Sequence, residues 1–233
     1  MVDTPRYAIY YAPPPGSELD RFGAHLLGYD AFLGEDLPFP GGIEHTMPDW
    51  RDLTRDPRKY GFHATLKAPM LLADGKTEQD LLAACEAFAG LARPIPVISP
   101  VVNAIGDFIA IAPAHPSAEL QQLAADAVTG FENFRAPLTP HDRARRNPER
   151  LSAKQREYLD RLGYPYVMEE FRFHMTLTGR LPADRGESVL AVLRQRFSDL
   201  PIVTLAVDRI TLLRQDDPGS RFRVLRDFGL TPA

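Results

Sequence analysis

The sequence predicts an α+β fold in which two similar lobes face each other across a central cleft. Two short stretches, residues 60–67 and 171–178, share the order aromatic, His, apolar, Thr, Leu. Each alternates polar and apolar residues with the period of a half-buried strand. A helix start, an apolar helical stripe and strand-like runs follow both stretches in the same order. This repetition predicts a pseudo-duplicated domain with antiparallel sheets lining the cleft and helices on the outside.

Alternation places the polar residues of each stretch on one face, because residues i, i+2 and i+4 of a strand point the same way. The polar set comprises His63, Thr65, Lys67, His174, Thr176 and Thr178. The intervening apolar residues require a core. Two such strands side by side would therefore present two imidazoles and two Thr hydroxyls in the cleft.

Caps and apolar spacing predict the elements that precede the first motif. Residues 6–12 form a strand, and Ser17 opens a helix that ends near Gly28. Residues 29–59, rich in Pro, Gly and Asp, form a long loop with a helical turn near Trp50. Long loops are often binding loops or lids, so this segment either covers the cleft or is packed, irregular surface.

The remaining elements come from the two repeats and the segment that joins them. Helices are predicted to start at a Thr77–Asp80 cap, near Ser117, at a Ser152–Gln155 capping box and at Asp184. Strands are predicted at residues 94–98, 108–112, 201–207 and 222–225. No linker interrupts these elements, so residues 1–233 are expected to form a single domain of two lobes.

The paired motifs resemble those of the 2H phosphoesterase superfamily, which has two His-x-Thr strands in two similar halves. That superfamily includes cyclic nucleotide phosphodiesterases and enzymes that act on 2′,3′-cyclic phosphates. More narrowly, residues 61–69, 141–146 and 171–179 resemble a branch found with bacterial phosphonate-utilisation genes. The resemblance covers nearly the whole chain and implies a cyclic phosphodiesterase.

The chemistry also follows from the residue types. A histidine near its ordinary pKa can act as base or acid at neutral pH. His63 and His174 would activate a water and protonate the leaving alkoxide, with the choice of base left open. Thr65 and Thr176 would bind the non-bridging phosphate oxygens, and Lys67 would add a positive charge. The sequence has no His-Glu-x-x-His, His-x-His or paired-Cys motif, so neither a metal nor a cofactor is expected.

Five further residues are candidates for substrate binding. Tyr10 and Tyr11 could stack on a sugar or base, although alternate strand residues also face the core. Arg143 and Arg146 would form either an anion-binding edge or a solvated charged loop. Thr178 occupies the position that Lys67 has in the first repeat, so the two half-sites are not equivalent.

Composition narrows the choice of substrate and location. A net charge of −4 argues against a broad surface for long nucleic acids, and favours a small anionic phosphate-containing substrate over RNA ends. The single Cys85, expected in the core, and the lack of a long apolar run predict a cytoplasmic protein with no membrane contact. No obligate protein partner is evident.

These observations predict metal-independent hydrolysis of a small cyclic phosphodiester. Given the resemblance, a ribose cyclic phosphate from phosphonate breakdown is attractive. The alternatives are an RNA or nucleoside 2′,3′-cyclic phosphodiesterase and a non-catalytic module that binds phosphorylated ligands or RNA ends.

Overall fold

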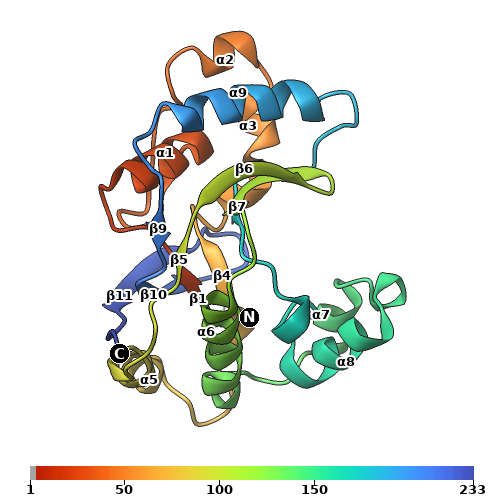
Figure 1. Ribbon diagram of the computed structural model, residues 1–233. Helices are drawn as coiled ribbons and strands as arrows, with labels where there is room; N and C mark the ends of the chain where they lie inside the picture. The colour runs from red at the N-terminus through yellow and green to blue at the C-terminus, as the bar shows by residue number, and fades with distance from the viewer. Residues whose placement is uncertain (1–3) are drawn as a thin grey trace.

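The computed structural model describes residues 4–233, and a seven-stranded antiparallel sheet runs through its centre (Figure 1). The strand order is β11-β10-β1-β4-β8-β7-β6. The strands are β1 (Arg6–Tyr11), β4 (Ala64–Leu71), β6 (Pro100–Ile105), β7 (Phe108–Pro113), β8 (Met175–Thr176), β10 (Arg209–Gln215) and β11 (Arg223–Gly229). Two small sheets pair β2 (Tyr29–Asp30) with β3 (Glu35–Asp36), and β5 (Val97–Ile98) with β9 (Leu205–Ala206). The predicted α+β class is confirmed, with one main sheet holding both motifs.

Helices surround this sheet. The helices are α1 (Glu18–Leu27), α2 (Ile43–Thr46), α3 (Trp50–Leu53), α4 (Arg55–Arg58), α5 (Glu78–Gly90), α6 (Ala118–Gly130), α7 (Pro140–Ala144), α8 (Ala153–Leu162) and α9 (Gly186–Ser198). Short 3₁₀ turns are η1 (Glu132–Phe134), η2 (Pro148–Arg150) and η3 (Met168–Glu170). In Figure 1, α1, α2, α3 and α9 gather at one end, α5 and α6 at the other, and α7 and α8 project to one side. Among residues 4–233, no helix has both the length and the apolar character needed to cross a membrane.

Most helix ends follow the predicted caps. Ser17 accepts a hydrogen bond from the Asp20 amide, and both the Thr77–Asp80 and Ser152–Gln155 capping boxes are formed. The start of α9 differs from the prediction. Its N-cap is Arg185, not Asp184, and that side chain forms an ion pair with Asp49.

One hydrophobic core joins the two repeats. It receives the apolar partners of both motifs, namely Phe62, Ala64, Leu66, Phe173, Met175 and Leu177. Cys85 lies in the same core, where burial raises the pKa of its thiol to about 12. We retain the single two-lobed domain as a proposal, which this continuous core supports.

Residues 29–59 are packed against the rest of the molecule rather than forming an open loop. Trp50 is fully buried, and its indole nitrogen donates to the Leu26 carbonyl at 2.9 Å. The Tyr29 hydroxyl donates to the Phe222 carbonyl at 2.8 Å. Because buried aromatic groups hold residues 29–59 in place, this segment fits a packed, irregular surface better than a lid that opens over the site.

The second motif forms a shorter strand than its alternation predicts. Only Met175–Thr176 pair as β8, because the amides of Leu177 and Thr178 both donate to the Ile109 carbonyl. Two residues facing one partner interrupt the ladder. The run at 201–207 is likewise reduced to β9, whereas β6 and β10 extend the sheet at residues where no strand was predicted.

Candidate active site

The two His-x-Thr motifs lie on neighbouring strands at the centre of the sheet. β4 and β8 are antiparallel and pair Ala64 with Met175. Continuing that register by one residue each way places His63 across from Thr176, and Thr65 across from His174. All four side chains are half-buried. The two motifs therefore form one site with a local two-fold arrangement.

Backbone carbonyls hold both imidazoles in the same way. Nδ1 of His63 lies 2.9 Å from the Gly61 carbonyl oxygen, and Nδ1 of His174 lies 2.8 Å from that of Arg172. Because a carbonyl oxygen only accepts, each Nδ1 carries the proton and each Nε2 is the basic nitrogen. Nε2 of His63 lies 3.3 Å from the Thr65 hydroxyl.

A left-handed glycine makes the His63 contact possible. Gly61 has φ of +75°, and an added Cβ would lie 2.6 Å from the Cβ of Ala31. Only glycine fits this turn without strain or a clash. The turn brings the Gly61 carbonyl back toward the imidazole two residues later.

Aromatic rings cover the β1 side of His63. The Tyr10 ring stacks on the imidazole at 3.8 Å between centroids, with 19° between the planes. Tyr60 lies 6.1 Å from the imidazole and stacks on Phe222 at 5.4 Å. On the other side, Phe108 lies 5.5 Å from the His174 ring.

This environment favours neutral imidazoles. Burial lowers the pKa of His63 to about 4, with an opposing effect of the Gly61 carbonyl and a further lowering by His174. Burial also lowers the pKa of His174, against the effect of its hydrogen bond to Arg172. A charge on one histidine thus disfavours a charge on the other.

The structure corrects the placement of Lys67. In the pairing of β1 with β4, Tyr10 faces Thr65 and Ile9 faces Lys67, so Leu66 is an extra residue in the ladder. Such a bulge redirects the following side chain. Lys67 therefore lies opposite Ile9, a core residue, and its ammonium contacts the Val128 carbonyl at 2.9 Å and the Glu132 carboxylate. It is 3% exposed and is not free to bind phosphate.

Two further candidates also lie away from the site. Tyr11 is fully buried, packs on Phe173 at 6.0 Å between centroids, and lies 3.4 Å from the Ala206 carbonyl oxygen. Thr178 is fully buried, and its hydroxyl accepts from the Ile109 amide at 3.0 Å. Strand alternation and the end of the β8 ladder turn both side chains inward.

The remaining candidates separate into different environments. Tyr10 lies directly at the site, as its stacking on His63 shows. Arg146 lies over the Tyr164 ring at 5.0 Å and is near enough to Tyr10 to affect its pKa. Arg143 instead forms an exposed ion pair with Asp160 at 2.7 Å. Of the two arginines, only Arg146 is placed to act with the site.

Three neighbours of the site were not among the site residues predicted from the sequence: Arg6, Tyr60 and Phe222. The guanidinium of Arg6 lies 5.6 Å from the Phe222 ring centre. Alternation along β1 was the available signal, because Arg6 and Tyr10 share one face of that strand. Phe222 comes from the distant end of the chain and gave no comparable signal.

Comparison with family models matches residues 65–223 to a family described as "Protein of unknown function (DUF1045)". The chain belongs to this family. Two curated relatives are called ribose 1,5-bisphosphate phosphokinase PhnN. The one from Janthinobacterium sp. (strain Marseille) is 37% identical over 93% of this chain and 49% of its own length. The one from Laribacter hongkongensis (strain HLHK9) is 31% identical over 95% of this chain and 51% of its own length. The DUF1045 chain thus spans about half the length of these relatives.

Solved structures similar to this DUF1045 chain include E. coli LigT complexed with 3′-AMP. That structure has a TM-score of 0.48 and 14% identity, covering 98% of this chain and 99% of its own. A structure named phosphoesterase has a TM-score of 0.42 and 14% identity, and the match covers 97% of this chain and 98% of that one. A protein of unknown function from Agrobacterium tumefaciens has a TM-score of 0.47 and 12% identity, and the match covers 98% of this chain and 87% of that one.

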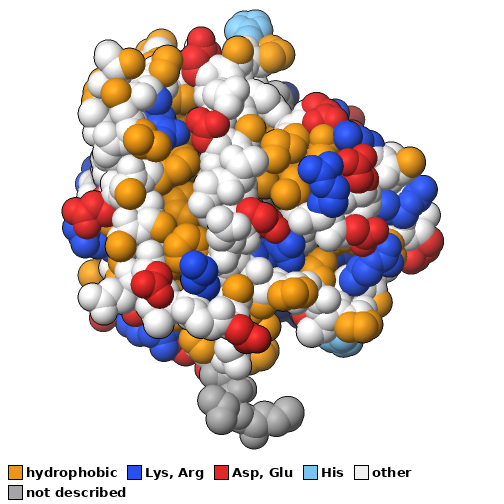
Figure 2. Space-filling model, turned by 90° about the horizontal axis from the view of Figure 1, so that it is seen from below, with side chains coloured by type: hydrophobic (Ala, Val, Ile, Leu, Met, Phe, Trp, Pro, Cys, Tyr) orange, Lys and Arg blue, Asp and Glu red, His pale blue; other side chains and the backbone are white. Residues whose placement is uncertain are grey.

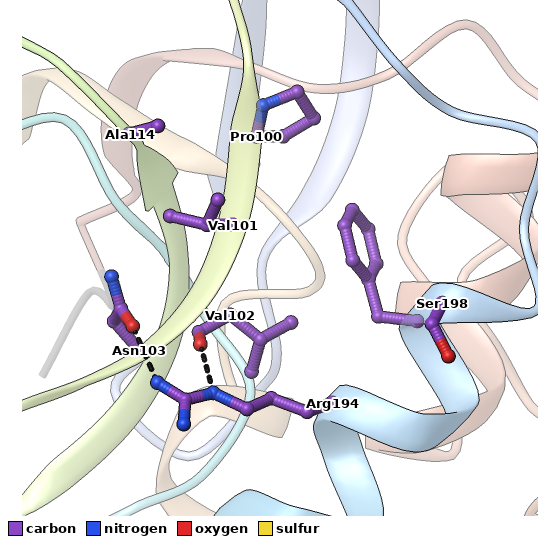
Figure 3. A pocket seen from close by; sticks show the side chains of 8 residues that line it. Pro100, Val101, Val102, Asn103, Ala114, Arg194 and Ser198 are labelled. Atoms are coloured by element: carbon purple, nitrogen blue, oxygen red, sulfur yellow. Dashed lines mark hydrogen bonds between the residues drawn. The ribbon is translucent and has the colours of Figure 1, made fainter.

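Two hollows on the DUF1045 chain lie apart from the paired histidines. One, of about 460 Å³, lies between β6 and α9 (Figure 3). There Arg194 donates to the Val102 carbonyl at 3.0 Å and to the Asn103 side chain at 2.8 Å, which attaches the helix to the sheet. The other, of about 540 Å³, lies between α1 and the segment after β3 and includes His25. Neither is lined by a motif residue.

The surface of the DUF1045 chain in Figure 2 interleaves Lys and Arg with Asp and Glu, and hydrophobic side chains lie between them. This face therefore lacks the uniform basic surface that a long nucleic acid requires. Within residues 4–233, no group of three or more His, Cys, Asp and Glu side chains is arranged to hold a metal ion.

We expect the lowered pKa of His63 to make stability fall as the pH drops from about 6.5 toward about 4. In that interval the unfolded chain binds a proton at residue 63 and the folded chain does not. Unfolding midpoints measured across this range should fall less steeply for His63→Gln than for the wild type. An equal slope in the two proteins, or an imidazole that titrates near 6.5 by NMR, would contradict the prediction.

Proposed function

We propose that this chain hydrolyses a small cyclic phosphodiester by general acid–base catalysis at His63 and His174, without a metal. The observation that carries the proposal is the matched tautomer of the two imidazoles. Each Nδ1 is engaged by a backbone carbonyl, so the two Nε2 atoms are left for proton transfer on one face of the sheet. A Thr hydroxyl from the neighbouring strand lies across from each histidine.

In the proposed reaction one histidine accepts a proton and the other donates one. One Nε2 removes a proton from a water as the water oxygen forms a bond to phosphorus. The bond from phosphorus to one ring oxygen breaks, and the second imidazolium gives its proton to that alkoxide. Thr65 and Thr176 donate hydrogen bonds to the non-bridging oxygens as negative charge shifts onto them. The product is a phosphomonoester, and solvent restores the two protonation states.

Electrostatics supports a pair of histidines in which one acts as the base and the other as the acid. Repulsion between the two charges favours a pair that holds one proton rather than two. A bound phosphate anion supplies negative charge that favours the protonated form of one histidine. The histidine that holds this proton is the acid, and the other is the base.

A ribose cyclic phosphate is the substrate that we favour. The curated relatives carry a name that refers to a ribose bisphosphate, and the motifs resemble a phosphonate-associated branch. Those relatives are about twice as long as the matched region, and this sequence contains no complete Gly-x-x-x-x-Gly-Lys-Ser/Thr motif. We therefore assign the named kinase activity to the other half of those relatives and a linked ribose-phosphate reaction to this one.

A panel of cyclic phosphates in EDTA tests the proposal. It contains a ribose 1,2-cyclic phosphate, 2′,3′-cyclic nucleotides and a short RNA that ends in a cyclic phosphate. We expect chelator-resistant turnover with preference for the ribose compound. Preference for the RNA end, with steep salt dependence, would favour the RNA phosphodiesterase instead. No turnover of any substrate, with binding retained, would overturn hydrolysis and favour a binding module.

A further inference from the structure

Arg6 lies on the same side of the sheet as the site, beyond the aromatic rings that cover His63. Its guanidinium lies 5.6 Å from the Phe222 ring centre, Phe222 stacks on Tyr60 at 5.4 Å, and Tyr60 lies 6.1 Å from the His63 ring. β1, which carries Arg6, borders β4 on the side away from β8. Arg6 is thus on the His63 side of the site, opposite His174.

A buried amide positions Arg6 without neutralising it. Nε of Arg6 donates to the Gln215 side-chain oxygen at 2.8 Å, and Nη2 donates to the same oxygen. Gln215 is 4% exposed, and its amide nitrogen donates to the Ser220 carbonyl at 2.7 Å. Since Arg6 only donates and the Ser220 carbonyl only accepts, the amide orientation is fixed. A glutamate here would cancel the charge, whereas glutamine preserves it.

Arg146 approaches the same region from the segment between α7 and α8. Its guanidinium lies over the Tyr164 ring at 5.0 Å. Burial raises the pKa of Tyr10. The nearby Tyr60 and Tyr164 raise this pKa further, whereas Arg6 and Arg146 lower it. All four groups therefore lie near enough to Tyr10, the ring that stacks on His63, to act on its charge. Among residues 4–233, neither Arg6 nor Arg146 forms an ion pair with a carboxylate.

We propose that Arg6 and Arg146 bind a second phosphate group of the substrate, while the histidines act on the cyclic one. The substrate class is then a cyclic phosphodiester that also carries a separate phosphomonoester. Guanidinium groups match phosphate oxygens bidentately, and two cations without a carboxylate partner among residues 4–233 suit the dianion of a monoester better than a neutral hydroxyl. This inference rests on the proposed function, because it adds specificity to the same site.

Matched substrates with and without the second phosphate test the inference. The pairs are ribose 1,2-cyclic phosphate with or without a 5-phosphate, and adenosine 2′,3′-cyclic phosphate with or without a 5′-phosphate. We expect the wild type to prefer the phosphorylated member in kcat/KM. Arg6→Gln and Arg146→Gln should each reduce that preference by ~10- to 100-fold, as expected for loss of a charge-assisted contact, because the phosphorylated member loses more than the unphosphorylated one.

Three further variants separate charge from folding. Gln215→Glu keeps Arg6 in place but neutralises it, and should reduce the preference as Arg6→Gln does. Arg6→Lys should retain part of it. Arg226→Gln, an exposed arginine over the Phe228 ring in the core, is the matched control and should leave the preference unchanged. If the Arg6 variants unfold, Arg146→Gln still tests the inference, because Arg146 is exposed and its replacement should not disturb the fold. Equal loss for both members of a pair would overturn the inference.

Calorimetric binding of inorganic phosphate, ribose 5-phosphate and ribose 1,5-bisphosphate distinguishes this inference from the proposed hydrolysis. Tighter binding of the bisphosphate that Arg6→Gln abolishes, without turnover of any cyclic phosphate, would support the second phosphate site and overturn hydrolysis. Turnover of cyclic phosphates with no preference for a second phosphate would overturn the second site alone.

Discussion

Replacing either His63 or His174 by Ala is expected to lower kcat/KM for the cyclic phosphate by ~10²- to 10⁴-fold, the usual contribution of one acid–base group. The kcat/KM of the double variant should be only slightly below that of the less active single variant, because the effects of two groups that act in one proton-transfer cycle are not additive. The measurement is initial-rate hydrolysis in EDTA on the best substrate of the panel, with unfolding midpoints to confirm that each variant is folded.

His25→Ala is the matched control. Nδ1 of His25 also contacts a backbone carbonyl, that of Pro38 at 2.8 Å, but His25 lies on α1 beside a hollow that holds no motif residue. Its replacement should leave turnover within about twofold of the wild type. Turnover that survives His63→Ala or His174→Ala would exclude that histidine from the acid–base pair.

Lys67→Met is expected to destabilise the fold by ~2 kcal/mol while leaving KM within about twofold of the wild-type value. The change removes the buried ammonium that joins β4 to the Val128 carbonyl and to Glu132, and buried charge-assisted contacts contribute about this much. Glu132 retains its ion pair with Arg135, which limits the loss. Urea unfolding and steady-state kinetics on one preparation measure both quantities.

Lys154→Met provides the comparison. Lys154 forms exposed ion pairs with Glu157 and Glu169, and surface pairs of this kind are worth only ~0–1 kcal/mol. A large rise in KM for Lys67→Met at unchanged stability would show that Lys67 binds phosphate after all, as its position in the sequence motif first predicted.

Local patterns determined much of the fold before any tertiary contact was known. The caps at Ser17, Thr77 and Ser152 start helices where predicted, because side-chain oxygens satisfy amides within the same turn. Alternation alone predicted that the two His-x-Thr motifs present polar side chains on one face and apolar ones to a core. Both signals depend on neighbours within a few residues, which a sequence displays directly.

Residues 29–59 and the strand ends were less predictable. The long segment has no period, and its order comes from distant partners such as the Leu26 carbonyl for Trp50 and the Phe222 carbonyl for Tyr29. β8 ends after Thr176 because two successive amides share the Ile109 carbonyl. Such limits arise from pairing with another strand and leave no mark in the strand's own sequence.

The helix caps, the apolar faces and the paired histidines and threonines can be read from neighbours along the chain. The residues that surround the paired histidines are set by contacts between distant parts of the chain. An extra residue in β4 turns Lys67 to the core, and strand order brings Arg6 and Phe222 to the His63 side. Side-chain direction depends on the register between strands, and this register is set by pairing across the sheet and not along the chain.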